Sequence, residues 1–347
     1  MPALPKLSYV LLSHNREKYI RAAVESALSQ DYEGELEYIF SDDCSTDRTF
    51  EIIKECVAAY KGNRRVVVTQ PPTNLKTAGN FNHAVSLAQG DWIIRADDDD
   101  ISAIDRCSVI GKVVSSIPDC TYVATESSYF FQDEEEEAAV GTSRIPCAQG
   151  MCTREIDIRT MPPSQCSFRS VEYSYKAWDR SCFRTFGDIP DAAYLADDYI
   201  LYFRASVLGK GVLVDNANAV LVRNNSLHQS IGSDNKSEGY HDIMRRERFF
   251  DEYQNSTAAP MRQTYEALLD FARRMPQDEQ PGVLAFLADM REKIRTTETL
   301  RSYWRRGTIN RVRIAQELGM SRPYDMLRCL PMPVFVALSA IFRKIHK

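Results

Sequence analysis

Apolar runs and amphipathic segments alternate along the first hundred residues of the chain. Four runs rich in β-forming residues predict strands, at Leu7–Ser13, Leu36–Ser41, Arg65–Thr69 and Asp91–Ala96. Between these runs, apolar residues recur at the spacing that gives a helix one buried face, as they do from Ile20 to Leu28. Strands that alternate with helices are typical of βαβ units. The pattern predicts an α/β fold, in which a mostly parallel sheet carries helices on both faces.

Small and polar residues mark the expected ends of these helices. Asn15 precedes the first helix, and Thr46 or Asp47 precedes the second. At such positions a short polar side chain can accept a hydrogen bond from the first N–H groups of the helix. We expect Thr77 to open the third helix and Gly90 to end it.

The second half of the chain is less regular. It predicts three further elements: a helix at Ala196–Gly209 and short strands at Val212–Val214 and Ala219–Val222. From Met244 to Leu318 the chain is rich in Arg, Glu and Leu with helical periodicity. We therefore divide the chain into an α/β domain, residues 1–235, and a C-terminal α-helical region, residues 236–347. A homodimer formed through these C-terminal helices is a further expectation.

The C-terminal tail, Leu330–Lys347, joins a short apolar stretch to the basic residues Arg343, Lys344 and Lys347. It is too short to span a bilayer. Two interpretations fit its amphipathic pattern equally well, a helix lying on an anionic membrane surface and a helix docked on the protein. With no signal peptide before the first strand, we expect a cytoplasmic protein, peripheral at the inner face of the plasma membrane if the tail binds there.

Composition excludes some classes of function. The net charge of −5 argues against a general nucleic-acid binder. The nine cysteines are scattered and contain no CxxC pair, so that a zinc site is not expected and free thiols in a reducing compartment are the simplest account.

Four consecutive aspartates, Asp97–Asp100, directly follow the predicted fourth strand. Taken alone, such a run fits a solvated acidic turn. Polar residues also follow the first strand, at Ser13–Asn15, and the second, at Asp42 and Asp43. Ligands of open α/β sheets bind at the carboxyl ends of the strands, and carboxylates there suit a hard divalent cation. The convergence favours a ligand site.

Five ordered blocks make the chain resemble a family 2 glycosyltransferase with the GT-A (Rossmann-like) fold, from about Leu7 to Ser230. The blocks are Tyr9–Asn15, Ser41–Asp47, Asn74 with Asn80–Asn82 and Gly90–Asp91, Asp97–Ile101, and Asp197–Asp198 with Leu201, Arg204 and Gly211. Four residues depart from the family pattern. Cys44 and Lys76 replace glycines, Phe81 replaces an arginine that contacts phosphate, and Asp197 replaces a glutamate.

The resemblance implies how a nucleotide-sugar donor, a UDP-sugar, would be bound. Asp42 or Asp43 would accept a hydrogen bond from the base, although Asp43 also suits a simple turn. Ser13 would contact the base or ribose, unless it only forms the turn. The remaining residues of the expected donor site are Asn15, Asn74, Asn82, Asp97 toward the ribose, and Asp98 at the variable position of the motif.

The same resemblance implies a divalent cation, Mg²⁺ or Mn²⁺. Asp99 would ligate it directly, Asp97 would approach it through water, and Asp100 would support it from behind. The cation would offset charge on the leaving diphosphate. His228 is a further candidate ligand, although an ordinary loop histidine is an equally good account of it.

Asp198 would be the general base that activates the acceptor hydroxyl, with Asp197 beside it. Both could instead favour a helix N-terminus through its dipole. Attack from the face opposite the leaving group implies inversion at the anomeric carbon. Trp178 and Asp179 could meet the acceptor, but Trp178 suits the core as well.

We therefore expect an inverting, metal-dependent glycosyltransferase that acts on a glycan or lipid-linked glycan acceptor, in surface polysaccharide synthesis. Two alternatives come from other classes. A sugar nucleotidyltransferase shares the sheet but predicts a glycine-rich loop after the first strand, where this chain has Ser13–Glu17. A non-catalytic nucleotide-sugar-binding protein predicts loss of a catalytic carboxylate.

Overall fold

The computed structural model describes residues 3–131, 152–165, 175–190, 196–215, 217, 219–224, 258–300 and 308–317 of the 347-residue chain. Every statement about the structure refers to these residues.

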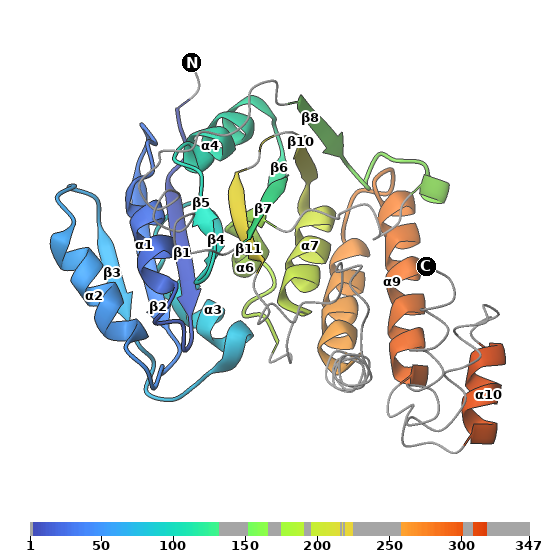
Figure 1. The fold of residues 1–347 in the computed structure, drawn as a ribbon. Coiled ribbons are helices and arrows are strands. Elements are labelled where there is room, and N and C mark those ends of the chain that lie inside the picture. The colour runs from blue at the N-terminus through green and yellow to red at the C-terminus, as the bar shows by residue number, and fades with distance from the viewer. Residues whose placement is uncertain are drawn as a thin grey trace.

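An eight-stranded sheet lies at the centre of the molecule (Figure 1), in the strand order β3-β2-β1-β4-β9-β6-β10-β8. The strands are β1 (Leu7–Ser13), β2 (Leu36–Asp42), β3 (Val66–Thr69), β4 (Trp92–Asp97), β6 (Cys120–Thr125), β8 (Cys152–Ile156), β9 (Tyr175–Asp179) and β10 (Lys210–Asp215). Only β8 and β9 pair antiparallel with their neighbours in this sheet. The predicted mostly parallel sheet is confirmed, with its first four strands within one residue of the expected ends.

A smaller sheet holds the chain just after the aspartate run. It joins β5 (Ile101–Ser102), β11 (Val220–Asn224) and β7 (Ser127–Phe131). Because β5 begins directly after Asp100 and pairs with β11, the aspartate run connects the large sheet to the small one.

Helices cover both faces of the large sheet, as the periodicity predicts. The helices of the described residues are α1 (Ile20–Leu28), α2 (Thr49–Ala59), α3 (Lys76–Leu87), α4 (Arg106–Ser116), α6 (Ser181–Arg184), α7 (Ala196–Leu208), α9 (Gln280–Leu300) and α10 (Thr308–Glu317), with a 3-10 turn η1 (Pro163–Gln165). Of these, α10 lies away from the sheet (Figure 1). Tyr9 and Leu11 of β1 belong to a core shared with α1, α2 and α4, whereas Val10 and Leu12 belong to a core shared with α3, α7 and α9. Successive side chains of β1 point to opposite faces of the sheet, so that they contribute to two separate hydrophobic cores.

Asn15 does not cap α1, contrary to the prediction. The residue before α1 is Tyr19, which makes no side-chain capping bond. Asn15 adopts a left-handed backbone with φ 54°, and its Oδ1 accepts the N–H of Thr46 at 2.8 Å. A contact between two loops has replaced the local cap, and sequence spacing carries no signal of it.

Gly90 does not end α3 either, because the helix ends at Leu87 and Ala88 is already extended. Gly90 passes close to β1, and a Cβ there would lie 2.5 Å from the Ser8 Oγ and 2.6 Å from the Ser8 nitrogen. The glycine is therefore required by close backbone approach. The start of α3 at Lys76 is one residue before the predicted Thr77.

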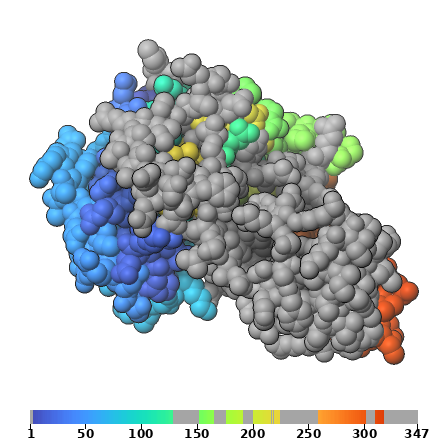
Figure 2. Space-filling model, viewed as in Figure 1, coloured from blue at the N-terminus to red at the C-terminus, as the bar shows by residue number. Residues whose placement is uncertain are grey.

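Helix α9 packs onto the α/β domain. The Phe286 ring of α9 lies 6.0 Å from the Tyr202 ring and 5.5 Å from the Phe203 ring of α7. Gly282 of α9 lies against the carbonyl of Ile158. In the space-filling view the N-terminal residues, in blue, and α10, in red, lie at opposite sides of the molecule (Figure 2).

Two expectations about the C-terminal part have different outcomes. Within the described ranges, no helix combines the length and the apolar character needed to cross a membrane. The tail Leu330–Lys347 lies outside the described residues, so its membrane contact stays a prediction.

Candidate functional site

The carboxyl ends of β1, β2 and β4 bring the predicted site residues together. Register pairs Ser13 with Asp42 across β1 and β2, and Leu12 with Asp97 across β1 and β4. The Ser13 hydroxyl donates to Asp42 at 3.3 Å. Parallel pairing alone places these strand ends side by side.

Asp42 is fully buried, and both of its carboxylate oxygens are occupied. One oxygen accepts the Ser45 N–H at 3.0 Å and the Gln70 side-chain amide at 2.7 Å. The other accepts the Ser13 and Ser45 hydroxyls. These bonds tie the end of β2 to the loop after β3, which gives Asp42 a structural role.

Asp43 has a different environment. Its N–H donates to the Ser13 carbonyl at 2.8 Å, and one carboxylate oxygen accepts the Leu75 N–H at 2.7 Å. In the part of the chain that the structure describes, no group donates to its other oxygen. This oxygen can accept a hydrogen bond from a ligand.

His14 lies beside Asp43 and is a site residue that the sequence analysis did not single out. Its Nδ1 is 2.8 Å from the Asp43 carbonyl oxygen, and its Nε2 is 2.9 Å from the Asn15 side-chain nitrogen. An amide donor at Nε2 and a carbonyl acceptor at Nδ1 fit the tautomer with the proton on Nδ1. The Asn74 amide nitrogen lies 3.4 Å from the same ring and 3.3 Å from the Asp43 carbonyl.

The three predicted asparagines have different surroundings. Asn15 joins the loops after β1 and β2, and Asn74 lies next to His14. Asn82 uses both atoms of its amide on the backbone of Ile189, at 2.8 and 2.9 Å. A role of Asn82 in donor binding stays a prediction.

The aspartate run is held by groups from β4 itself, from the loop after β1 and from β11. Asp97 accepts from Arg95 at 3.3 Å and keeps 43% of its side chain exposed. Asp98 accepts the His14 N–H at 2.9 Å. The N–H of Arg223, in β11, donates to Asp100 at 3.0 Å. The smaller sheet and the first loop therefore fix the run from two sides.

Burial raises the pKa of Asp98 well above its usual range, and the negative charge of Asp99 adds to the shift. The nearby Arg16 guanidinium and the His14 N–H lower the pKa, but by less than burial raises it.

The aspartate run does not form a complete metal cage. No three His, Cys, Asp or Glu side chains among the described residues are arranged to hold a cation. The exposed Asp97 and the neighbouring carboxylate of Asp99 still fit a divalent cation that takes most of its ligands from phosphate and water, as Mg²⁺ usually does. These residues therefore suit a cation that arrives with a diphosphate.

The predicted base lies in a described helix, but its side chain is not described. Asp197 and Asp198 occupy the first turn of α7, while the orientation of their side chains lies outside the described residues. His228 also lies outside the described residues. Trp178 is in β9 and is buried against Phe81, so it belongs to the core. Asp179 accepts the Ser181 N–H at the start of α6.

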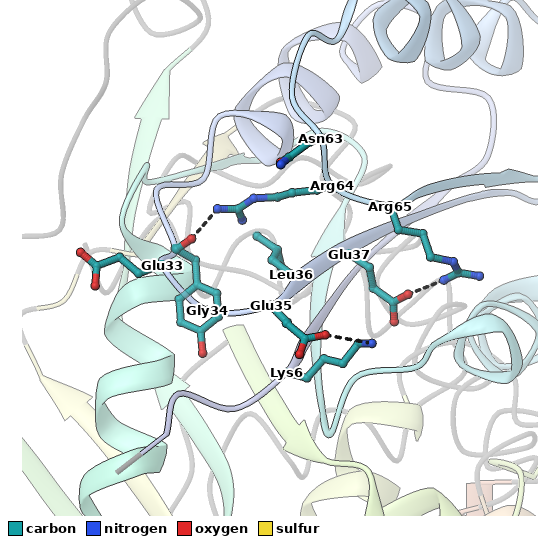
Figure 3. A pocket seen from close by; sticks show the side chains of 10 residues that line it. Lys6, Glu33, Gly34, Glu35, Leu36, Glu37, Asn63, Arg64 and Arg65 are labelled. Atoms are coloured by element: carbon teal, nitrogen blue, oxygen red, sulfur yellow. Dashed lines mark hydrogen bonds and ion pairs between the residues drawn. The ribbon is translucent and has the colours of Figure 1, made fainter. Parts of the chain in front are cut away.

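A separate cavity of about 400 Å³ lies at the amino ends of β1, β2 and β3 (Figure 3), at the edge of the sheet opposite the aspartates. Its three cations are matched by acceptors in its own wall. Lys6 pairs with Glu35 at 3.3 Å, Arg65 pairs with Glu37, and Arg64 donates to a backbone carbonyl. This balance of charge sets it apart from the aspartate site.

Comparison with known proteins agrees with this geometry. Residues 8–170 match the model of glycosyl transferase family 2. EpsE of Bacillus subtilis (strain 168), which carries the name of a glycosyltransferase, is 41% identical over 98 residues, or 28% of this chain and 34% of that protein. The chain thus spans about a third of the length of that relative.

Two solved structures share the fold. The crystal structure of Staphylococcus aureus TarS 1-349 in complex with UDP has a TM-score of 0.50 at 16% identity, covering 98% of this chain and 91% of that one. The mannosyltransferase PcManGT from Pyrobaculum calidifontis, in complex with GDP-Man and Mn²⁺, has a TM-score of 0.50 at 14% identity, covering 100% and 90%. The chain therefore has the GT-A fold, and its residues 8–170 are similar to glycosyl transferase family 2.

Proposed function

We propose that the chain transfers a sugar from a UDP-sugar to a hydroxyl group of a glycan or lipid-linked glycan, with inversion and with the help of Mg²⁺ or Mn²⁺. The observation that carries the proposal is the Asp43 oxygen left open beside His14 and Asn74, next to the aspartate run. The UDP in the TarS structure and the GDP-Man and Mn²⁺ in PcManGT support a nucleotide-sugar donor and a divalent cation.

Asp43 is the better candidate of the two acidic residues for contact with the base. The imide N–H of uracil needs an acceptor, and the open Asp43 oxygen supplies one, whereas Asp42 has no oxygen to spare. The His14 ring and the Asn74 amide would then border the same base. Ser13 is buried and bonded to Asp42, which leaves it a supporting role.

Asp97 and Asp99 would hold the cation, and Asp97 has the exposure to reach the ribose as well. When bound, the cation would offset the negative charge that develops on the leaving diphosphate. Asp100, bonded to the backbone of Arg223, would keep the run in place from behind.

Asp198 would take the proton from the acceptor hydroxyl, and Asp197 would raise its proton affinity. Their place in the first turn of α7 supports the assignment only by position. Attack by the activated oxygen forms the new glycosidic bond as the bond to the diphosphate breaks, so that the anomeric carbon is inverted.

A donor screen tests the proposal directly. UDP with Mn²⁺ should raise the melting temperature more than GDP, ADP or CDP with Mn²⁺, since a ligand that binds only the folded state stabilises it. EDTA should remove the effect and the hydrolysis of UDP-sugars. If EDTA leaves the melting temperature with UDP unchanged, the divalent cation is excluded from the proposal. If another nucleoside diphosphate raises the melting temperature more than UDP does, uracil is excluded as the base of the donor.

The base is tested by Asp198→Asn. This change should abolish transfer, because general bases contribute on the order of 10²–10⁴ in rate. The affinity for UDP should stay within about twofold of wild type, since the base would contact the acceptor and not the donor. Transfer by Asp198→Asn at the wild-type rate would exclude this residue. Asp270→Asn, at an exposed aspartate that pairs with Arg274, is the matched control and should leave transfer unchanged.

We also propose peripheral contact with the inner face of the plasma membrane through residues 331–347, and a homodimer through the C-terminal helices. Removal of residues 331–347 should release the protein from vesicles that contain anionic lipid. Unchanged sedimentation with the vesicles would favour a docked tail, and light scattering of the full chain measures the oligomeric state.

A further inference from the structure

Three arginines from three different elements face the four aspartates of the run. Arg16 lies in the loop between β1 and α1, Arg95 in β4 and Arg223 in β11. Arg16 Nε is 3.5 Å from a carboxylate oxygen of Asp98 and 3.8 Å from one of Asp99. Most of the negative charge that would attract a cation is therefore already opposed within the protein.

The three arginines differ in their freedom to move. Arg223 is fully buried, with its guanidinium 4.7 Å from the centre of the Tyr19 ring and its Nε bonded to the Asp99 carbonyl at 3.0 Å. Arg95 has only 15% of its side chain exposed and lies 5.6 Å from the Phe81 ring centre. Arg16 is 36% exposed, and its contacts with Asp98 and Asp99 are longer than ordinary charged hydrogen bonds.

Arg16 has a fixed backbone, whereas its partly exposed guanidinium makes a hydrogen bond, from Nη1 to the Asn15 carbonyl at 3.2 Å, beside its contacts with Asp98 and Asp99. Its N–H donates to the Thr49 hydroxyl at 2.7 Å, and its carbonyl accepts the N–H groups of Tyr19 and Ile20, both at 2.9 Å. The guanidinium can therefore change partners by rotation about side-chain bonds, without movement of the loop.

We propose that Arg16 is a resident counter-ion of the aspartate run that changes partners when the donor binds. It would release Asp98 and Asp99 as the divalent cation enters and turn to the oxygens of the donor diphosphate. This inference rests on the proposed metal-dependent use of a nucleotide sugar.

Electrostatics gives the exchange its direction. A guanidinium beside Asp99 repels a divalent cation at the same carboxylate, so that the cation alone binds weakly. A diphosphate brings new negative charge, and a planar guanidinium matches phosphate oxygens through paired hydrogen bonds. Binding of the cation and of the diphosphate would thus be linked through one side chain, and neither would bind well alone.

The test compares Mn²⁺ alone with Mn²⁺ and UDP together in the full-length Arg16→Gln variant. We expect Mn²⁺ alone, followed by the electron paramagnetic resonance signal of the free ion, to bind about tenfold tighter than to wild type, because a repelling charge is gone. We expect UDP in saturating Mn²⁺, followed by calorimetry, to bind about tenfold more weakly, because a charged hydrogen bond is lost.

Two further variants keep the result interpretable. Arg48→Gln removes an equal charge from an exposed arginine that pairs with Glu51 and Glu55, and it should change neither affinity. Arg16→Lys keeps the charge and should leave the affinity for Mn²⁺ alone near the wild-type value. It covers the case in which Arg16→Gln does not fold.

Each outcome decides the inference. Opposite shifts in the two affinities of Arg16→Gln support it. Mn²⁺ that binds Arg16→Gln no more tightly than wild type, or UDP that binds it equally well, overturns the exchange and leaves the proposed function standing. A wild-type protein that binds neither Mn²⁺ nor UDP overturns the metal-dependent function, and the inference with it.

Discussion

Asp42 and Asp43 are consecutive residues at the end of β2, yet their carboxylates have opposite roles. Both carboxylate oxygens of Asp42 accept hydrogen bonds from groups of the protein. One oxygen of Asp43 accepts the Leu75 N–H, and no group among the described residues donates to the other. The difference arises because Asp42 lies within β2, where Ser13 and Gln70 reach its carboxylate, whereas Asp43 follows the strand and accepts the Leu75 N–H.

This difference predicts separate effects for the two residues. Asp43→Asn keeps an acceptor for the Leu75 N–H, so stability should stay near wild type while UDP affinity falls about tenfold or more. Asp42→Ala leaves the buried Ser13 hydroxyl and the half-buried Ser45 N–H without this acceptor, and should lower the free energy of unfolding by about 1–3 kcal/mol. Urea unfolding and calorimetry with UDP measure the two quantities. Full UDP affinity in Asp43→Asn would refute the contact with the base.

Cys44 and Lys76 stand at positions where the resemblance to the glycosyltransferase family implies glycine. Both have left-handed backbones, with φ 55° and 60°. A side chain costs about 1–2 kcal/mol in this region, while glycine adds entropy to the unfolded chain. Lys76→Gly should therefore raise the free energy of unfolding by about 0.5–1 kcal/mol. Lys76→Ala keeps the Cβ and should gain nothing, so that equal gains from both variants would contradict backbone strain.

The sequence predicts which residues lie together at the strand ends, but it does not predict which role each of them has. Parallel strands predict that Ser13, Asp42 and Asp97 meet, because every such strand ends at the same edge of the sheet. The assignment of Asp42 depends on Gln70, which is 28 residues away along the chain, and such contacts leave no periodic signal.

The same limit explains the errors at Asn15 and Gly90. Each suits a helix end by its residue type, but tertiary contacts with Thr46 and Ser8 decide its place. The role of Arg16 also depends on the fold, since only the pairing of β1 with β4 brings the first loop to the aspartate run.

Glu37 predicts how stability responds to acid. Its burial raises the pKa, but hydrogen bonds from Ser8, Gln89, Arg65 and Gly90 outweigh burial and hold the pKa below the ordinary value of 4.5. A lowered pKa in the folded state contributes stability above the unfolded pKa, and this stability is lost as pH falls through the folded pKa.

Glu37→Gln should therefore lower the free energy of unfolding at pH 7 and flatten its decline below about pH 4.5. Urea unfolding at a series of pH values measures the slope. Glu35→Gln is the matched control, because Glu35 is 78% exposed in its pair with Lys6, and surface pairs contribute little. An unchanged acid slope in Glu37→Gln would mean that other carboxylates set the acid limit.

Gly282 tests whether the C-terminal helices are independent of the α/β domain. A Cβ at this position would lie 1.9 Å from the Ile158 carbonyl oxygen and 3.1 Å from that of Met161. Gly282→Ala should thus push α9 away and lower the free energy of unfolding by about 1–3 kcal/mol. Were α9 part of a separate domain without this contact, the same change would raise stability by up to about 1 kcal/mol through helix propensity.

The sign of the change in Gly282→Ala therefore distinguishes the two arrangements, and a single denaturant titration measures it. Arg291→Ala, at an exposed position of the same helix, should change stability by less than about 0.5 kcal/mol. If Gly282→Ala lowers the free energy of unfolding and Arg291→Ala does not, α9 docks at the Ile158 carbonyl. The division at residue 236 would then separate two parts of the sequence that fold around one core, since Phe286 of α9 and Phe203 of α7 pack in the same cluster.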